Sequence, residues 1–241
     1  KGMTQLILDL SDNGGGYLNT AVELANTFLR AGETIVYTEG NRSPRYDAVA
    51  NGKGGYKDGK LVVLVNQYSA SASEILAGAV QDWDRGVVVG RRTFGKGLVQ
   101  RPFTFEDGSM MRLTTARYYT PSGRCIQKPY KMGEKADYAK DVYNRYKDGE
   151  LQHADSIHVA DSLKYTTLKN ERIIYGGGGI IPDVFVPIDT TEYSDYYGKL
   201  NTKGVFIQYT LGYIDKNRDS LKAKYKDVNE FDAGFKVSDE M

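Results

Sequence analysis

Short apolar runs alternate with stretches of helical spacing along the first part of the chain. Residues 6–10 and 86–90 predict strands, and residues 61–65 are apolar throughout, as expected of a strand buried on both faces of a parallel sheet. Residues 18–29 and 72–83 place apolar side chains at i, i+3, i+4 and i+7, which predicts helices. Strands that alternate with helices in this way predict α/β layering with right-handed crossovers.

An antiparallel portion is predicted beside these layers. Residues 34–38 predict one more strand, and the Gly- and Lys-rich residues 40–60 predict an excursion over the surface. Residues 98–105 and 110–118 flank the turn signal Glu106-Asp-Gly-Ser109 and therefore predict a hairpin.

The second half of the chain carries weaker signals. Residues 131–164 are charged, tyrosine-rich and weakly helical, whereas residues 172–175 and 180–186, which flank four glycines, predict a return of the chain to the sheet. Beyond residue 190 the sequence predicts amphipathic, mostly polar helices. We therefore expect a core over residues 1–190 and a C-terminal helical extension over residues 191–241.

Composition limits the chemistry of the chain. Its 40% apolar and 26% charged residues are typical of a soluble globular protein, and its net charge of +1 favours neither a nucleic acid nor an acidic membrane as partner. No apolar run approaches the ~20 residues of a membrane helix. Cys125 is the only cysteine, which excludes an internal disulfide and a Cys-rich metal site, and we expect His153 and His158 to be exposed. A hydrolase built on this chain would act without a histidine base.

Ser71 lies between a predicted strand and a predicted helix, in the run Tyr68-Ser-Ala-Ser-Ala-Ser-Glu74. One interpretation is structural, with Ser71 as helix cap and Glu74 completing a capping box. The other is chemical, because a serine on a strand-to-helix turn is exposed and the first N–H groups of the helix can stabilise an oxyanion. We interpret Ser69 and Ser73 as turn and first-turn residues. This stretch alone favours the cap.

Lys96 follows a predicted strand and lies between two glycines, in Thr93-Phe-Gly-Lys-Gly-Leu-Val-Gln100. A lysine acts as a general base only if burial or neighbouring groups lower its pKa from about 10.4 toward neutrality. Phe94, Leu98 and Val99 could supply apolar surroundings. The competing interpretation is a lysine on a flexible glycine loop.

Two glycine-rich segments are candidates for ligand binding. Residues 90–97 approach the phosphate-binding pattern G-x-x-x-x-G-K-[ST], but Gly97 replaces the hydroxyl residue that would hold magnesium, and a strand is predicted next instead of a helix. Nucleotide binding is therefore the least favoured function. Residues 12–16 (Asp-Asn-Gly-Gly-Gly) follow the first strand at its carboxyl end, where α/β sheets bind ligands. They predict a tight turn whose N–H groups could face a reacting carbonyl.

Together these elements resemble the C-terminal processing, or tail-specific, protease family of Ser-Lys serine peptidases. The resemblance is dense over roughly residues 4 to 130, and the order and spacing of its motifs are specific. The matching segments are LDLSDNGGG (8–16), VNQYSASASEI (65–75), RTFGKG (92–97), LTTARYYTPSGR (113–124) and, later, GGGIIPD (177–183).

The resemblance implies a catalytic pair. Ser71 would be the nucleophile, Lys96, 25 residues downstream, the general base, and Gln100 the residue that orients the lysine. The pair would cut protein or peptide substrates near their C-termini through an acyl-enzyme, without a metal or cofactor.

The resemblance also implies supporting groups. The backbone N–H of Ala72, with that of Gly15 or Gly16, would form the oxyanion hole. Asp82 matches a position where some members carry a functionally important aspartate, although it could equally be a helix-end residue. Two departures from the family pattern are Gly14, where many members have proline, and Cys125, where serine is common.

The fold that the family implies is a crotonase- or ClpP-like β-α superhelical core, to which the antiparallel portion and the helical C-terminal region are added. Family members act in the periplasm or cell envelope, often with a PDZ domain. Because the chain opens on Lys1 close to a core strand, we expect that domain and an early part of the catalytic domain to lie upstream. The alternative function is a non-catalytic peptide- or ligand-binding module of the same fold.

Overall fold

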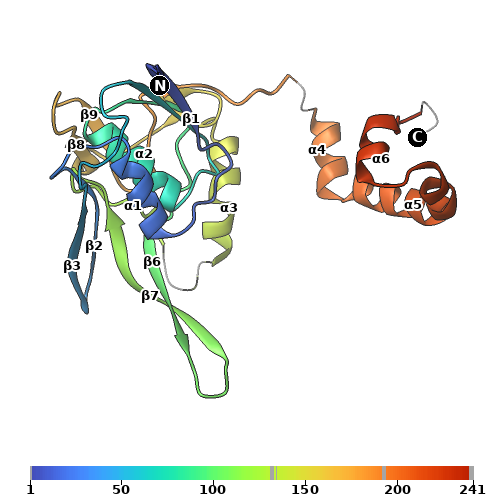
Figure 1. Ribbon diagram of the computed structural model, residues 1–241, viewed down its shortest axis with the longest axis horizontal. Coiled ribbons are helices and arrows are strands. Elements are labelled where there is room, and N and C mark those ends of the chain that lie inside the picture. Colours follow the sequence, from blue (N-terminus) through green and yellow to red (C-terminus); the bar gives the residue numbers. More distant parts are fainter. Residues whose placement is uncertain (1, 131–132, 134, 192–193, 239–241) are drawn as a thin grey trace. The chain divides into compact units, whose positions relative to one another are not determined.

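The computed structural model describes residues 2–130, 133, 135–191 and 194–238. Lys1, the residues at 131, 132, 134, 192 and 193, and the last three residues lie outside this range, although they fall within segments interpreted above. The chain divides into two compact units, Lys1–Ile188 and Asp189–Met241 (Figure 1).

A parallel sheet of four strands organises the first unit. Its strands lie in the order β1-β4-β5-β10, and every neighbouring pair is parallel. Their bounds are β1 Gln5–Asp9, β4 Lys60–Val65, β5 Val87–Gly90 and β10 Val184–Phe185. The three strands predicted at 6–10, 61–65 and 86–90 are thus confirmed, and the structure shows that they are neighbours in one sheet.

Two helices pack beside the sheet and contribute buried side chains to the hydrophobic core. Helix α1 (Leu18–Asn26) ends earlier than the apolar spacing predicts, and α2 (Ala72–Asp82) matches its prediction closely. Every residue of α2 from Ser73 to Asp82 is buried. Because α2 is enclosed on all sides, each polar side chain on it needs a partner inside the protein.

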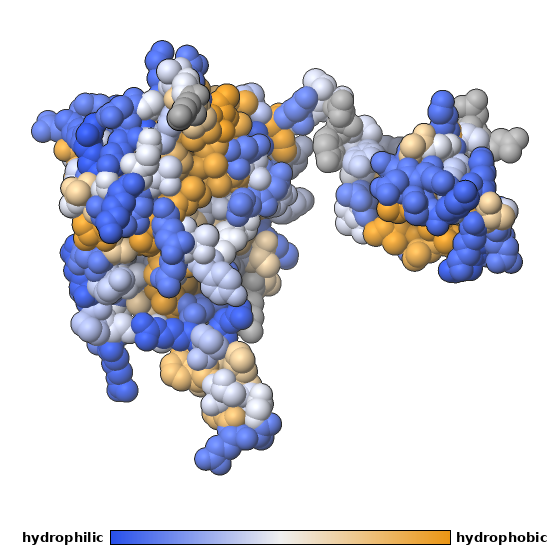
Figure 2. All heavy atoms as spheres, in the orientation of Figure 1, coloured by the Kyte–Doolittle hydropathy of each residue, from blue (hydrophilic) through white to orange (hydrophobic). Residues whose placement is uncertain are grey.

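One face of the parallel sheet is better covered than the other. Buried and half-buried positions alternate along β4, so the prediction of a strand buried on both faces is wrong for this structure. Ile7 on β1 is 67% exposed, and Val87 on β5 is 43% exposed. Figure 2 shows apolar surface in the region of β1. The apolar sequence of β4 reflects its central place in the sheet more than complete burial.

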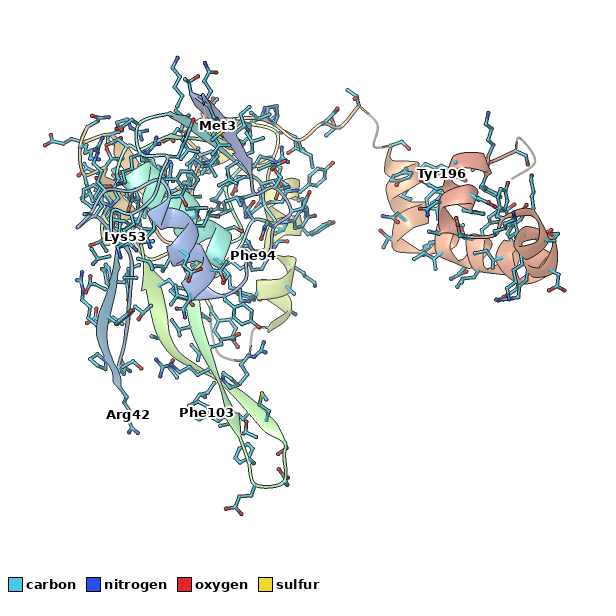
Figure 3. All side chains as sticks on the ribbon, viewed as in Figure 1. Met3, Arg42, Lys53, Phe94, Phe103 and Tyr196 are labelled. Atoms are coloured by element: carbon cyan, nitrogen blue, oxygen red, sulfur yellow. The ribbon has the colours of Figure 1, made fainter. Side chains whose placement is uncertain are left out.

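A second sheet is antiparallel, in the order β3-β2-β7-β6. Its bounds are β2 Thr34–Gly40, β3 Ser43–Val49, β6 Leu98–Thr104 and β7 Met110–Tyr119. The predicted β6–β7 hairpin is confirmed and projects from the unit, with Phe103 on it (Figure 3). The surface excursion predicted for residues 40–60 is confirmed for most of its residues, which are exposed, and it contains an unpredicted strand: β3 pairs with β2 in a second hairpin whose turn carries Arg42 (Figure 3).

The return of the chain to the sheet is confirmed only in part. Of the two predicted segments, β10 joins the parallel sheet, whereas β9 (Ile173–Tyr175) pairs with β8 (Lys164–Thr166) in a separate ribbon. The weakly helical segment contains α3 (Lys135–Lys147) and two short 3-10 turns, Ala154–Ser156 and Asp161–Leu163.

The second unit consists of helices α4 (Asp195–Thr202), α5 (Val205–Lys224) and α6 (Val228–Gly234). Ser194 and Asp227 cap α4 and α6 by accepting backbone N–H groups. No residue of α5 or α6 is buried, and Figure 2 shows apolar side chains on the surface of this unit. Within the described residues, no helix has the length and apolar character that a membrane crossing requires.

Candidate active site

Three loops meet at one edge of the parallel sheet. They follow β1, β4 and β5, whose carboxyl ends lie side by side because the strands are parallel neighbours. Ala70 N donates to Asn13 O at 3.0 Å and joins the second loop to the first, and Phe94 N donates to Ser69 O at 2.9 Å and joins the third loop to the second. The topology therefore assembles the serine, the lysine and the glycine turn at one edge.

Ser71 stands on a strained turn directly before α2. Its φ of 57° and ψ of −113° lie in a region that residues other than glycine rarely adopt. Such a conformation costs about 1–3 kcal/mol and persists only where surrounding contacts impose it. Ser71 and Glu74 stand in the predicted capping relation, with Ser71 N donating to Glu74 Oε2 at 2.8 Å. The structural and chemical interpretations of Ser71 are thus compatible.

The other two serines of the run hold the turn in place. Ser69 Oγ donates to Leu10 O at 2.6 Å, and Ser73 Oγ donates to Asn13 O at 3.0 Å. Both hydroxyls tie the second loop to the first, as turn and first-turn residues would. Of the three serines, Ser71 alone has the strained backbone.

Gly15 lies against the N-terminus of α2. It has a φ of 95°, and a Cβ on it would be 2.6 Å from Ala70 O and 2.8 Å from Ala72 N. Its own N–H donates to Asn13 Oδ1 at 2.9 Å, so it is not free for a ligand. The N–H groups of Gly16 and Ala72 have no hydrogen-bond partner in the described part of the chain. Of the two glycines predicted for the oxyanion hole, Gly16 thus keeps an N–H group without a partner among the described residues, whereas Gly15 permits the close approach of the two loops.

The Glu74 carboxylate connects the serine turn to the lysine loop. It is fully buried, and its Oε2 accepts Ser71 N and Lys96 N, each at 2.8 Å. Its Oε1 accepts Thr93 Oγ1 and Gly95 N, each at 2.6 Å. Burial raises the pKa of Glu74 above its ordinary value, and the four hydrogen bonds counteract part of that rise.

The loop that carries Lys96 is closely packed, which argues against a flexible glycine loop. A Cβ on Gly95 would be 3.1 Å from Gly179 N, and one on Gly97 would be 2.5 Å from Gln127 N. Glycine is needed at both positions because backbone passes so close. The Lys96 side chain is half-buried, and the described residues include no hydrogen bond between its Nζ and Ser71 Oγ.

Two further predicted residues do not join this cluster. Gln100 is exposed on β6, directly after a register irregularity, and makes no hydrogen bond to Lys96 within the described residues. Asp82 is fully buried at the opposite end of α2 from Ser71, roughly 16 Å along the helix at 1.5 Å per residue. There it forms an ion pair of 2.6 Å with Arg124 and accepts Ser122 N at 2.8 Å.

Sequence reasoning missed two buried groups beside the cluster. Thr93 has no exposed surface, and its hydroxyl donates to Glu74 while accepting Ile180 N at 2.7 Å. Lys128 Nζ lies 3.9 Å from the centre of the Phe94 ring, and burial lowers its pKa. The only signal for Thr93 was its buried partner Glu74 near the start of α2, whereas nothing local indicated Lys128.

A pocket of about 250 Å³ opens beside the candidate oxyanion donors. Most of its surface is apolar, so it suits an uncharged side chain more than a phosphate or a metal ion. It is lined by Leu10, Asn13, Gly15, Gly16, Tyr17, Thr20, Ala21, Leu24, Ala72, Ser73 and Leu76.

The segment at residues 90–97 that approaches the phosphate-binding pattern is not arranged to hold a phosphate. The N–H groups of Gly95 and Lys96, which a phosphate would need, already donate to Glu74. No group of three or more His, Cys, Asp or Glu side chains is arranged to hold a metal within the same range.

Family comparison agrees with the motifs. The model of peptidase family S41 matches residues 1–139, which is more than half of the chain, and a family of unknown function (DUF8443) matches residues 196–241. The first match contains Ser71, Lys96 and the glycine turn. The second falls within the C-terminal helical unit.

Individual relatives point the same way. A carboxyl-terminal-processing protease of Picosynechococcus is 47% identical over 128 residues, which cover 53% of this chain and 30% of that protein. A probable CtpA-like serine protease of Staphylococcus aureus is 39% identical over 166 residues, covering 68% and 32% of the two chains. The solved photosystem II D1 C-terminal processing protease superposes with a TM-score of 0.53 at 31% identity, over 77% of this chain and 35% of that one. The chain thus spans about a third of each relative.

Proposed function

The chain belongs to peptidase family S41, and from this premise we propose that it forms the part of a serine endopeptidase that carries a Ser71–Lys96 dyad and cuts polypeptides near their C-termini. The observation that carries the proposal is the strained Ser71 turn beside two N–H groups, those of Gly16 and Ala72, that have no partner among the described residues. A serine held in this way presents its hydroxyl where those groups can receive the oxygen of an attacked carbonyl.

In the proposed mechanism, Ser71 Oγ attacks a peptide carbonyl while neutral Lys96 Nζ takes its proton. The N–H groups of Ala72 and Gly16 stabilise the negative charge that develops on the carbonyl oxygen. Protonated Lys96 then returns a proton to the departing amine, and water hydrolyses the acyl-enzyme. The sequence of steps needs no metal or cofactor. Gln100 stays a prediction as the residue that orients Lys96, because its side chain would have to turn inward from β6.

The apolar pocket beside Ala72 would receive an uncharged side chain of the substrate. Proteins and peptides are therefore the proposed partners. The division into a peptidase core over residues 1–190 and a helical extension over 191–241 is supported by the boundary between the two compact units after Ile188. The mixed α/β fold with its parallel sheet is compatible with a crotonase- or ClpP-like core. An upstream PDZ domain and a place in the periplasm or cell envelope stay predictions.

Peptide cleavage by the full-length protein tests the dyad. We expect Ser71→Ala and Lys96→Ala each to lower kcat by at least about 10³-fold, because each removes a group that takes part in bond making. The exposed Ser109 and Lys53 offer matched controls, and Ser109→Ala and Lys53→Ala should cleave like the wild type. Undiminished cleavage by either dyad variant would rule out the mechanism.

A non-catalytic binding module is the second candidate. The lack of a hydrogen bond between Ser71 Oγ and Lys96 Nζ in the described residues favours it. A binding module would hold peptides in the apolar pocket with equal affinity in the wild type and in both dyad variants, and it would release no product. Calorimetric titration with an uncleaved peptide, beside the cleavage assay, separates the two functions.

A further inference from the structure

The fully buried Glu74 carboxylate accepts four hydrogen bonds within the described core. A carboxylate offers about four lone-pair positions, and here four donors occupy them: three backbone N–H groups and the Thr93 hydroxyl. No ion pair to Glu74 is found among the described residues. The carboxylate is therefore held by neutral groups whose positions the main chain sets.

The donors come from the two segments that carry the proposed dyad. Ser71 N and Lys96 N both donate to the same oxygen, Oε2, at 2.8 Å. These two nitrogens can consequently lie no more than twice that length apart. Because the loops follow different strands, no covalent constraint near the site imposes this separation.

We propose that Glu74 is a positioning residue, which sets the strained Ser71 turn and the Lys96 loop relative to one another so that the two side chains can exchange a proton. The proposal rests on the proposed function, since it assigns Glu74 a task only if Ser71 and Lys96 react together. Glu74 itself touches neither the substrate nor the reacting atoms, because its oxygens are fully engaged inside the protein.

The four hydrogen-bond donors explain why this position needs a glutamate and not a glutamine. Glutamine has one carbonyl oxygen and one NH₂ group, so in Glu74→Gln the NH₂ would face two of the four donors. Either the serine turn or the lysine loop would then have to move away. A displacement of about 1 Å between reacting groups can cost on the order of 10²-fold in rate, even where substrate binding is unchanged.

The test compares Glu74→Gln with Glu33→Gln in the full-length protein. Glu33 is a matched control, a nearly buried glutamate that accepts Arg30 N at 2.8 Å and Lys169 Nζ at 2.7 Å and lies away from the candidate site. We expect Glu74→Gln to lower kcat by about 10²-fold with KM within about threefold, and Glu33→Gln to leave both constants unchanged.

A second readout does not depend on activity. Hydrogen exchange of the Gly95 and Lys96 amides should become at least about tenfold faster in Glu74→Gln at a temperature where the variant stays folded, and should not change in Glu33→Gln. If Glu74→Gln does not fold, Glu74→Asp replaces it. This variant keeps the charge but is one methylene shorter, and we expect its kcat to fall between those of the wild type and Ser71→Ala.

Each result is decisive. Unchanged kcat and unchanged amide exchange in Glu74→Gln, or full kcat in Glu74→Asp, would overturn the role of Glu74 while leaving the dyad intact, provided that Ser71→Ala is inactive. An equal loss of kcat in Glu74→Gln and Glu33→Gln would show that Glu74 contributes only to the overall stability of the fold. This outcome would also overturn the positioning role. If the wild type cleaves no peptide, the proposed function fails, and the positioning role fails with it.

Discussion

The two ends of α2 each enclose a fully buried carboxylate, and they satisfy it in opposite ways. At the serine end, Glu74 is surrounded by backbone N–H groups and one hydroxyl. At the other end, Asp82 is paired with the guanidinium of Arg124, which is itself buried. Both carboxylates join segments that are distant in the sequence, the first through neutral donors that lie mostly on the main chain and the second through a charged side chain.

This difference has a physical consequence. A long arginine side chain can bridge to several partners, and Arg124 also donates to Gln81 Oε1 at 2.7 Å and Tyr175 O at 3.0 Å. Such a cluster is suited to stabilising the fold, because it joins several segments of the chain. A guanidinium hydrogen-bonded to Glu74 in place of these donors would oppose the charge that Lys96 gains when it accepts a proton. Neutral donors around Glu74 avoid this repulsion, so the serine end is compatible with proton transfer and the aspartate end is not arranged for it.

The largest expected effect is a loss of stability when the ion pair at the aspartate end of α2 is broken. Arg124→Met leaves Asp82 as a buried charge without its cation, which typically costs about 3–5 kcal/mol in the free energy of unfolding. Urea unfolding followed by circular dichroism measures the loss. The exposed Arg112 is the control, and Arg112→Met should stay within about 0.5 kcal/mol of the wild type. A loss below about 1 kcal/mol for Arg124→Met would show that Asp82 does not depend on this partner.

The second prediction concerns the serine end of α2, where Gly15 lies close to the start of the helix. In Gly15→Ala the new Cβ meets Ala70 O and Ala72 N, and the positive φ disfavours any side chain. We expect kcat to fall by about 10²-fold, because the Ala72 N–H is displaced from the developing oxyanion. Gly14 provides the control, since a Cβ there meets nothing within 4 Å. Should Gly14→Ala and Gly15→Ala lose activity equally, the close approach of Gly15 would not matter to the reaction.

The smallest effect concerns Gln100. If this side chain orients Lys96 during the reaction, Gln100→Ala should lower kcat by about tenfold, the typical order for one lost hydrogen bond. If it stays exposed on β6, as the structure has it, kcat should not change. Steady-state peptide cleavage with the neighbouring exposed variant Arg101→Ala as control distinguishes these outcomes. An effect on KM alone would instead assign Gln100 to substrate binding.

Local patterns predicted much of the first unit. The apolar runs of β1, β4 and β5 and the spacing of α2 correspond to elements in the structure. The sequence did not indicate β3, because its residues SPRYDAV include proline and charged side chains, and pairing with β2 decides its conformation. It also did not show that residues 173–175 pair with β8 away from the main sheet, since a short apolar strand does not specify its neighbour.

For the candidate site, the chemical groups and their order can be read from the amino-acid sequence: a serine before a helix, a lysine between glycines and a glycine turn after the first strand. Their arrangement in space depends on contacts between distant segments. Parallel pairing of three strands brought the loops to one edge, and the reach of one buried carboxylate joined the serine turn to the lysine loop. Glu74 was visible in the sequence only as part of a helix cap, because hydrogen bonds from residues some twenty positions away leave no local pattern. Gln100 and Asp82 illustrate the opposite case. Both match positions of the family motif, yet a motif match does not place a side chain beside the reacting groups.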